Sequence, residues 1–318
     1  MINPSKKQLA VIYSAAGILA VFYILSLTVF SKTDNKRHLQ QIQLLHEADI
    51  PNIDIITIQC GSDSIILSRT DNMWLLVNPK NPEDRIPADT QRLQKFFVLL
   101  ASKHNMYRAG KSNSTNGNSY GLNESEGTYI TLYKNGAVYQ QLVFGSLNFS
   151  QTERYFKTQE LKSVFLAGRE FESFISVSQT NWTDPYIISS QLRNDVFTMG
   201  EVQTAAFYDY QNKKYGILSN SIPKQKEAID KLLELRHGGF AEINQNIQQN
   251  MSTLLHTMTI ILELGDKSKI TLEFFEHPQI ENEYIVQTSF DSERTGKSFT
   301  YTTQISLWTY NKISEMTL

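Results

Sequence analysis

Residues 53–68 read IDIITIQCGSDSIILS, and this stretch decides the predicted fold. Isoleucines recur among polar residues on both sides of the turn Gly61-Ser62-Asp63, a pattern typical of a β-hairpin. Residues 203–218 read QTAAFYDYQNKKYGIL and repeat this arrangement, with Gln211-Asn212-Lys213 at the turn. The sequence therefore predicts two equivalent hairpins, each opening one structural unit.

A helix with a matching apolar face follows each hairpin. Ile86-Pro87 corresponds to Ile222-Pro223, and proline is favoured at a helix start. A second hairpin then follows in each unit, at residues 129–144, with Asn135-Gly136 at its turn, and at residues 259–275. Hairpins on both sides of one helix predict α+β units, each a mainly antiparallel sheet with a helix packed on one face. The matching apolar positions are Leu93, Phe96, Phe97 and Leu99 in the first helix, and Ile229, Leu232, Leu233 and Leu235 in the second.

The two units define the predicted domains. The first repeat covers residues 52–180, the second covers 196–318, and a junction at 181–195 contains Pro185. Open sheet edges in such repeats can accept a strand from a partner. Each unit also contains two further strands and a closing short helix, at 154–158, 164–166 and 170–175 in the first repeat and at 284–288, 299–302 and 304–313 in the second. A Ser/Asn/Gly-rich segment at 111–119 predicts a flexible loop.

An uncharged segment near the N-terminus predicts a transmembrane helix. Residues 9–30 carry no charged side chain and reach about 33 Å as a helix, enough to cross a bilayer core. The short tail 1–8 before the segment has the layout of a signal anchor, which places the tail in the cytoplasm and the bulk of the chain outside it. Lys6 and Lys7 on one side nearly balance Lys32, Lys36 and Arg37 on the other, so the inverted orientation stays open.

Residues 31–51 connect the predicted span to the first repeat. Leu39, Ile42 and Leu45 recur at helical spacing, so a short helical stalk is predicted that ends at Pro51. Its apolar stripe has three alternative partners, which are the first repeat, a helix of another protein and lipid.

The first repeat contains a series of short motifs, which are Trp74-Leu75-Leu76, Ile86-Pro87-Ala88-Asp89, Tyr120-Gly121-Leu122, Tyr129-Ile130-Thr131-Leu132, Asn135-Gly136, Val143-Phe144-Gly145, Arg154-Tyr155-Phe156 and Val164-Phe165-Leu166. By the order of these motifs it resembles the bacterial domain-of-unknown-function 4340 family. The resemblance covers residues 53–180 and rests on the order of several short motifs. The second repeat lacks the Trp and the Tyr-Gly-Leu, and Glu124–Gly127 stands where the family usually has a proline.

The resemblance implies a location and a kind of partner. Members have an N-terminal membrane anchor and an extracytoplasmic body, and they resemble accessory proteins encoded beside gliding-type ABC transporters. The expected localisation is therefore the bacterial inner (cytoplasmic) membrane, single-pass, with a periplasmic bulk. The expected partners are membrane lipid, through the N-terminal helix, and ABC-type permease and ATPase subunits. The family has no established catalytic residues to transfer to this chain.

Composition and motifs exclude several function classes. The chain has 30 basic and 32 acidic residues in 318, so it has no basic field that would attract nucleic acid. It contains no phosphate-binding G-x-x-x-x-G-K-[ST] loop, no G-x-S-x-G elbow, no H-E-x-x-H and no paired cysteine motif. We therefore expect a protein that is not an enzyme, with no catalytic, cofactor-binding or metal-binding residues.

Three sets of residues have an alternative functional interpretation. The polar group Glu276, His277, Glu281 and Glu283 is either a solvated hairpin connection or a metal site. Trp74, Trp182 and Trp308 are either core residues or a ligand platform. Cys60 is either a strand residue or a reactive thiol. The remaining histidines, which are not at ligand spacing on one element, are His38, His46, His104, His237 and His256.

The expected function is that of a non-catalytic accessory or structural subunit of an ABC-type transporter or gliding-motility-like assembly. The alternative is an extracytoplasmic module that binds a solute, glycan or lipid in the cleft between the repeats.

Overall fold

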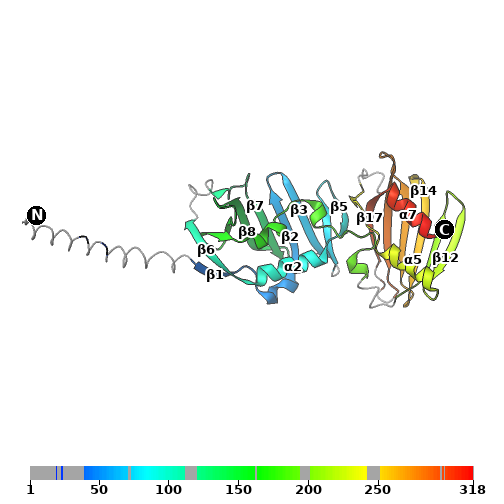
Figure 1. The fold of residues 1–318 in the computed structure, drawn as a ribbon, viewed down its shortest axis with the longest axis horizontal. Coiled ribbons are helices and arrows are strands. Elements are labelled where there is room, and N and C mark those ends of the chain that lie inside the picture. The colour runs from blue at the N-terminus through cyan, green and yellow to red at the C-terminus, as the bar shows by residue number, and fades with distance from the viewer. Residues whose placement is uncertain are drawn as a thin grey trace, which may run out of the picture.

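Two mainly antiparallel sheets form the body of the protein in a computed structural model (Figure 1). The structure describes residues 39–70, 73–111, 120–161, 163–193, 201–241, 251–293, 296 and 298–317, together with Leu19 and Tyr23. The predicted flexible loop at 111–119 lies outside the described residues, apart from the backbone of Lys111. The architecture is α+β, as the paired hairpins indicate.

The first sheet has ten strands in the order β1-β6-β10-β9-β8-β7-β2-β3-β4-β5. Helix α2 (Thr90–Ala101) lies across one face and buries Leu93, Phe96 and Leu100. Its strands are β1 (Leu39–Gln43), β2 (Ile53–Cys60), β3 (Asp63–Thr70), β4 (Met73–Asn78), β5 (Asn81–Pro87), β6 (Lys103–Lys111), β7 (Thr128–Lys134), β8 (Ala137–Leu147), β9 (Arg154–Thr158) and β10 (Ser163–Ala167). Short 3-10 helices occur at η2 (Glu47–Asn52), η4 (Arg169–Phe174) and η5 (Gln179–Asn181).

The second sheet has seven strands in the order β12-β11-β14-β15-β16-β17-β13. Helices α5 (Pro223–Leu233) and α7 (Leu307–Thr317) pack on it, and α5 buries Ile229 and Leu232. Its strands are β11 (Val202–Asp209), β12 (Lys214–Ser219), β13 (Gly239–Phe240), β14 (His256–Leu264), β15 (Lys269–Glu276), β16 (Glu283–Asp291) and β17 (Ser298–Ser306), and a 3-10 helix lies at η6 (Met251–Thr253).

Local chemistry accounts for the main turns and helix starts. At the β7–β8 turn, Asn135 and Gly136 both have positive φ (54° and 74°), which a tight hairpin turn requires and which these two residue types tolerate best. Asp89 caps α2, because its carboxylate accepts the backbone N–H of Arg92 at 3.0 Å. Pro223 begins α5, where its missing N–H removes no helical bond.

Both sheets follow one strand order. In the first sheet β6, β10, β9, β8, β7, β2 and β3 are neighbours in turn, and in the second β13, β17, β16, β15, β14, β11 and β12 are neighbours in turn. The first sheet adds β1 beyond β6 and the hairpin β4–β5 beyond β3. Within the described residues β12, the counterpart of β3, has no such hairpin beside it.

One hydrophobic cluster runs through both sheets. It contains core residues of the first sheet such as Phe156, residues of the second such as Leu272, and residues between them such as Ile187. Figure 1 places β5 and β17 next to each other where the sheets meet, and these two strands are in contact.

The predicted fold class and localisation require correction at the N-terminal segment. Both assumed a transmembrane helix, whereas no helix in the described part of the chain is long and apolar enough to cross a membrane. Helices α2, α5 and α7 have 12, 11 and 11 residues. At 1.5 Å per residue such helices reach about 18 Å, short of the roughly 30 Å of a bilayer core. The structure therefore does not support the single-pass inner-membrane placement. Of the predicted span 9–30 only Leu19 and Tyr23 are described, and the tail 1–8 lies outside the described residues.

The predicted helical stalk is wrong at its first described residues, whereas a short 3-10 helix, η2, follows at Glu47–Asn52. Leu39–Gln43 is strand β1, which pairs antiparallel with β6. The spacing of Leu39 and Ile42 suits a helix, but β6 offers backbone donors and acceptors along its edge, and tertiary pairing outweighs the local pattern. Of the three alternatives for the apolar stripe, the structure shows the first repeat, because Ile42 and Leu45 are buried in the core cluster.

Two substitutions on β8 test which of its residues contribute to the core. Phe144 is 1% exposed, with its ring centroid 4.9 Å from that of Phe156, whereas Val138 on the same strand is 54% exposed. Phe144→Ala should lower the free energy of unfolding by about 3–5 kcal/mol, and Val138→Ala should change it by less than about 0.5 kcal/mol. Urea denaturation of both variants measures the difference. Equal losses of unfolding free energy in the two variants would contradict the difference in burial between Phe144 and Val138.

Candidate functional site

The segment that joins the two sheets is buried, although the sequence predicted a junction there. Residues 182–192, called the connector below, follow η5 and lie between β5 of the first sheet and β17 of the second. Asp184 and Leu192 are buried, and the most enclosed residues, with no exposed surface, are Trp182, Ile187, Ile188 and Ser189. Each backbone polar group of this segment therefore needs a partner within the protein.

Backbone hydrogen bonds fix the connector to the first sheet. The N–H of Asp89 donates to the carbonyl of Trp182 at 2.9 Å, and the N–H of Asp184 donates to the carbonyl of Pro87 at 3.0 Å. Thr183 forms an isolated antiparallel bridge with Ala88. The connector thus pairs through its backbone with the residues at the end of β5 and directly after it.

The side chain of Gln191 adds a second attachment to the first sheet. Its Oε1 accepts the N–H of Trp74 at 2.9 Å. Its Nε2 donates to the carbonyl of Trp74 at 2.9 Å and to that of Ala88 at 3.3 Å. One amide therefore binds three backbone groups where β4 begins and β5 ends.

The connector is bound to the second sheet in a similar way. The N–H of Ile187 donates to the carbonyl of Leu235 at 2.9 Å, and the N–H of His237 donates to the carbonyl of Pro185 at 3.0 Å. The hydroxyl of Tyr301 donates to the carbonyl of Ile187 and accepts the N–H of Ser189 at 3.1 Å. Burial raises the pKa of Tyr301 far above its usual value, so this phenol stays protonated and able to donate.

Charged side chains gather around the connector. The Asp184 carboxylate accepts the N–H groups of Tyr186 at 3.0 Å and of Ser190 at 2.7 Å. Burial raises the pKa of Asp184, and these hydrogen bonds oppose the rise. The ring of Tyr186 has two cationic neighbours, because the guanidinium of Arg193 lies 3.7 Å and that of Arg236 lies 5.3 Å from its centroid.

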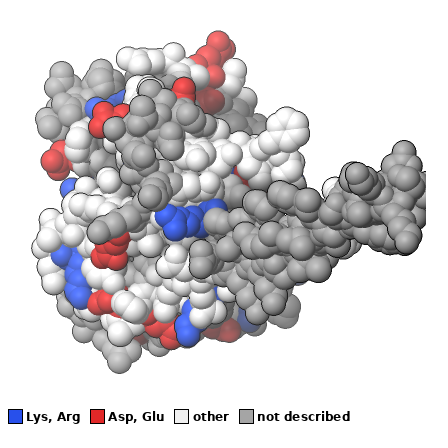
Figure 2. Space-filling model, turned by 90° about the vertical axis from the view of Figure 1, so that its left-hand side faces the viewer, with Lys and Arg blue, Asp and Glu red and all other residues white. Residues whose placement is uncertain are grey.

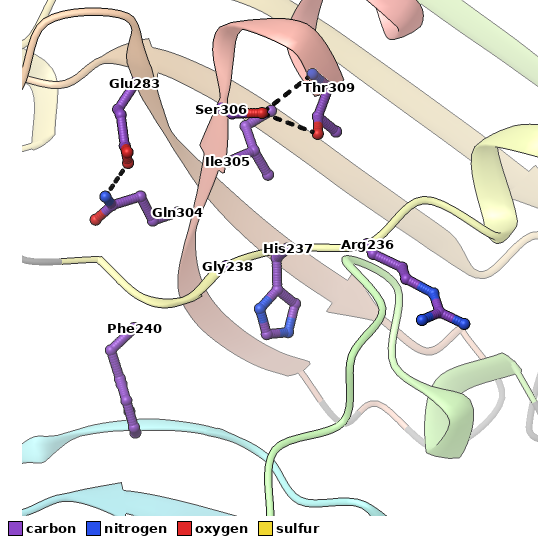
Figure 3. A pocket seen from close by; sticks show the side chains of 9 residues that line it. All are labelled: Arg236, His237, Gly238, Phe240, Glu283, Gln304, Ile305, Ser306 and Thr309. Carbon is purple, nitrogen blue, oxygen red and sulfur yellow. Dashed lines mark hydrogen bonds between the residues drawn. The ribbon is translucent and has the colours of Figure 1, made fainter. Parts of the chain in front are cut away.

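A cavity of about 440 Å³ lies beside this junction, in the second repeat (Figure 3). Nδ1 of His237 accepts the N–H of Gly239 at 2.9 Å, and burial lowers the pKa of His237 to about 4. The imidazole is therefore neutral near pH 7. The lining residues are Arg236, His237, Gly238, Phe240, Glu283, Gln304, Ile305, Ser306 and Thr309.

The polar groups of this cavity bind one another. Gln304 donates to the Glu283 carboxylate, and Ser306 Oγ lies 3.4 Å from both the N–H and the hydroxyl of Thr309. Among the described residues of the cavity no hydroxyl lies at hydrogen-bond distance from a histidine that would serve as its base. The arrangement suits the binding of a small polar molecule better than covalent chemistry.

The other histidines have structural partners where they are described. His104 Nε2 lies 2.7 Å from the carbonyl of Leu99, and His256 Nε2 lies 3.0 Å from the Thr259 hydroxyl. His46 precedes η2 at the surface, and His38 lies outside the described residues.

The acidic loop predicted as a hairpin connection or a metal site has other contacts. Nδ1 of His277 accepts the N–H groups of Gln279 and Ile280, and the Glu276 carboxylate accepts the amide of Gln211 at 3.0 Å. In the part of the chain that the structure describes, no group of three or more potential ligands gathers, at Glu281 and Glu283 or elsewhere.

The three tryptophans do not form a platform. Trp74 and Trp182 are buried around Phe96 and Phe97 of α2, with ring centroids 5.8 Å apart for Trp74–Phe97 and 5.9 Å apart for Phe96–Trp182. Trp308 is 66% exposed on α7, in the other repeat. Cys60 is a half-buried residue at the end of β2, as expected for a strand residue.

The end of the molecule far from the second sheet has no charged field of one sign. Figure 2 shows basic and acidic side chains interspersed with uncharged ones over the described surface there. With the formal net charge of −2, this gives no electrostatic footprint for nucleic acid on that face.

In comparisons with known proteins, no family model, no curated protein and no solved structure matches this chain.

The buried His237 predicts a specific pH dependence of stability. Its pKa is about 4 when folded and 6.5 when unfolded, so the unfolded chain binds more protons between these values. The contribution of His237 to the free energy of unfolding is fully present above pH 6.5. It is lost as pH falls toward 4, by about 3 kcal/mol at most. The raised pKa of Asp184 has the opposite effect on the pH dependence of stability. A variant that keeps Asp184 retains this contribution, so a comparison with the wild type cancels it.

His237→Asn is the matched control, because Asn keeps an acceptor near the Nδ1 position and does not titrate. Urea denaturation at pH 7, 6, 5 and 4.5 should show a smaller decline for the variant than for the wild type. Parallel declines would show that His237 makes no such contribution.

Gln191 tests the attachment of the connector. Gln191→Ala leaves the backbone groups of Trp74 and Ala88 without these partners and should lower the free energy of unfolding by about 1–3 kcal/mol. Hydrogen exchange at the N–H of Trp74 should accelerate in the same variant. Gln94→Ala, at an exposed position of α2, is the control and should change stability by less than about 0.5 kcal/mol.

Proposed function

We propose that this chain is a non-catalytic structural accessory subunit whose two sheets act as one rigid scaffold for partner proteins. The buried connector carries this proposal. Its residues bond to Pro87, Ala88 and Asp89 on one side and to Leu235 and Tyr301 on the other. Because the backbone groups of the connector are hydrogen-bonded on both sides, the connector opposes movement of one sheet relative to the other. A subunit that fixes the spacing of its partners needs this rigidity.

The class of partner is inferred from the sequence. The resemblance of residues 53–180 to the domain-of-unknown-function 4340 family supports the permease and ATPase subunits of an ABC-type transporter or gliding-motility-like assembly. The polar side chains of the described cavity bind one another, and the sequence contains no phosphate-binding loop. A partner must therefore supply any ATP hydrolysis.

A ligand-binding module with its site between the repeats has less support. The connector occupies that position with fully buried side chains such as Trp182 and Ile188. The cavity of about 440 Å³ lies beside the connector, and all of its lining residues, from Arg236 to Thr309, belong to the second repeat.

Affinity purification of the tagged full chain from a gentle detergent extract of its native cells tests the proposal. A permease and an ATPase should co-purify in fixed ratio and remain bound in several detergents. Recovery of the chain alone, at the mass of a monomer, in all of them would refute the scaffold function.

A further inference from the structure

Strand β12 leaves one edge of the second sheet open. Within the described residues its pairing partner is β11, and it is the last strand in the sheet order. Figure 1 shows β12 at the end of the molecule farthest from the first sheet. The residues of β12 are all exposed or half-buried.

Two hydrogen bonds identify which backbone groups face outward. The N–H of Asn220 donates to the carbonyl of Gln203 on β11, whereas the N–H of Ser219 donates to the side chain of Gln225 at 2.8 Å. Successive residues of a strand direct their backbone groups to opposite sides. The N–H and C=O groups of Tyr215 and Ile217 therefore point away from β11 and toward the open edge.

In the first repeat, the equivalent sheet edge is paired with another strand. There β3, the counterpart of β12, pairs antiparallel with β4, with Leu67 opposite Leu76 and Arg69 opposite Trp74. Among the described strands, the order of the second repeat matches that of the first up to β12, and no described strand lies beyond it. The comparison of the repeats therefore indicates room for a further antiparallel strand beside β12.

The side chains at this edge favour an apolar segment. Tyr215 is 58% and Ile217 is 52% exposed, and the ring of Tyr208 lies 4.8 Å from that of Tyr215. These three residues cover β11 and β12 on one face of the sheet. Residues at alternate positions of an added strand would pack beside them.

Basic residues flank β12 on both sides in the sequence. Lys213 and Lys214 precede the exposed pair, and Lys224 follows β12 in the first turn of α5. In the described part of the chain none of these three lysines has a carboxylate within ion-pair distance, whereas nearby Lys226 pairs with Glu201 at 3.5 Å. An added strand with acidic ends would complement both ends of β12.

We propose that β12 accepts an extended strand of a partner protein in antiparallel pairing, with apolar side chains at alternate positions and acidic residues at both ends. This inference rests on the proposed scaffold function and names the chemistry of one partner contact. A second copy of this chain is a poorer occupant. Antiparallel pairing of two β12 strands would bring Lys213 and Lys214 of one copy toward Lys224 of the other.

A synthetic peptide tests the pairing directly on the full chain. The peptide has five alternating Val and Thr residues between two Asp residues at each end, and a matched peptide has Lys in place of Asp. Fluorescence anisotropy at low salt should show at least about tenfold tighter binding of the Asp peptide, with a gap that narrows as salt rises. Binding should slow amide exchange at Tyr215 and Ile217.

Ile217→Pro removes one outward N–H without removing a bond to β11, so the variant should fold and melt near the wild-type temperature. It should weaken binding of the Asp peptide about tenfold or more, while Ile217→Val should bind within about twofold of the wild type. N-methylation of the peptide on the side facing β12 gives an independent test if the proline variant does not fold.

Three results of the peptide and hydrogen-exchange experiments would overturn the inference. They are no binding of the Asp peptide at millimolar concentration, equal binding of the Asp and Lys peptides, and concentration-dependent protection of Tyr215 and Ile217 in the protein alone, which would identify a second copy as the occupant. Co-purification separates the two proposals. If partners are recovered equally with Ile217→Pro and wild type, the strand site fails and the scaffold function stands, whereas loss of all partners from the wild type refutes the scaffold itself.

Discussion

The carbonyl oxygen of Ile187 marks the constraint on which the structure depends. It lies where the two sheets meet, away from water, and accepts hydroxyl groups from Tyr301 and Thr288 of the second sheet. A buried carbonyl without such partners would cost roughly 1–3 kcal/mol. The chain can pass between the two sheets only because the backbone groups of the connector are satisfied from both sides. This explains why a connecting segment is among the most buried parts of the protein.

Repetition of one strand order underlies the rest of the architecture. Each repeat builds its sheet from a first hairpin and a later run of strands, and packs a helix against them. The two differ at the edge beside the first hairpin, where β4 and β5 extend the first sheet toward β17. That added hairpin provides the carbonyls of Trp74 and Pro87 that the connector uses. The junction therefore depends on the feature that distinguishes the first repeat from the second.

Much of the sheet structure was predictable, because alternation and turn residues are local signals. The hairpins at 53–68 and 129–144 have turns with Gly61 and Asn135-Gly136, and all three residues have positive φ. Strand β5 was not predicted, because Pro82 and Pro87 obscure a strand that lies at the edge of its sheet. The helical stalk was wrong, since pairing of β1 with β6 does not depend on local spacing. For the predicted transmembrane helix, the described residues provide no supporting helix.

The junction site escaped prediction because its residues form no motif. Asp184, Gln191 and His237 act through backbone groups that are distant in sequence, and such contacts leave no fixed spacing. One available signal was the apolar content of the supposed linker, where Trp182, Ile187 and Ile188 are too hydrophobic for an exposed segment. The polar clusters that did attract attention, such as Glu276 with His277, are occupied by ordinary loop contacts.

The way in which the first sheet meets the second gives the molecule a direction. Strand β5, at one edge of the first sheet, faces β17, which lies toward the opposite edge of the second sheet in the shared strand order. The two repeats are thus arranged head to tail, and the two ends of the described body carry different strands, β1 at one end and β12 at the other (Figure 1). A head-to-tail pair has no symmetry axis that would make its ends equivalent. An assembly built along this axis is therefore polar, because each subunit presents a different strand at each of its two ends. Each subunit then distinguishes its two neighbours without a second protein.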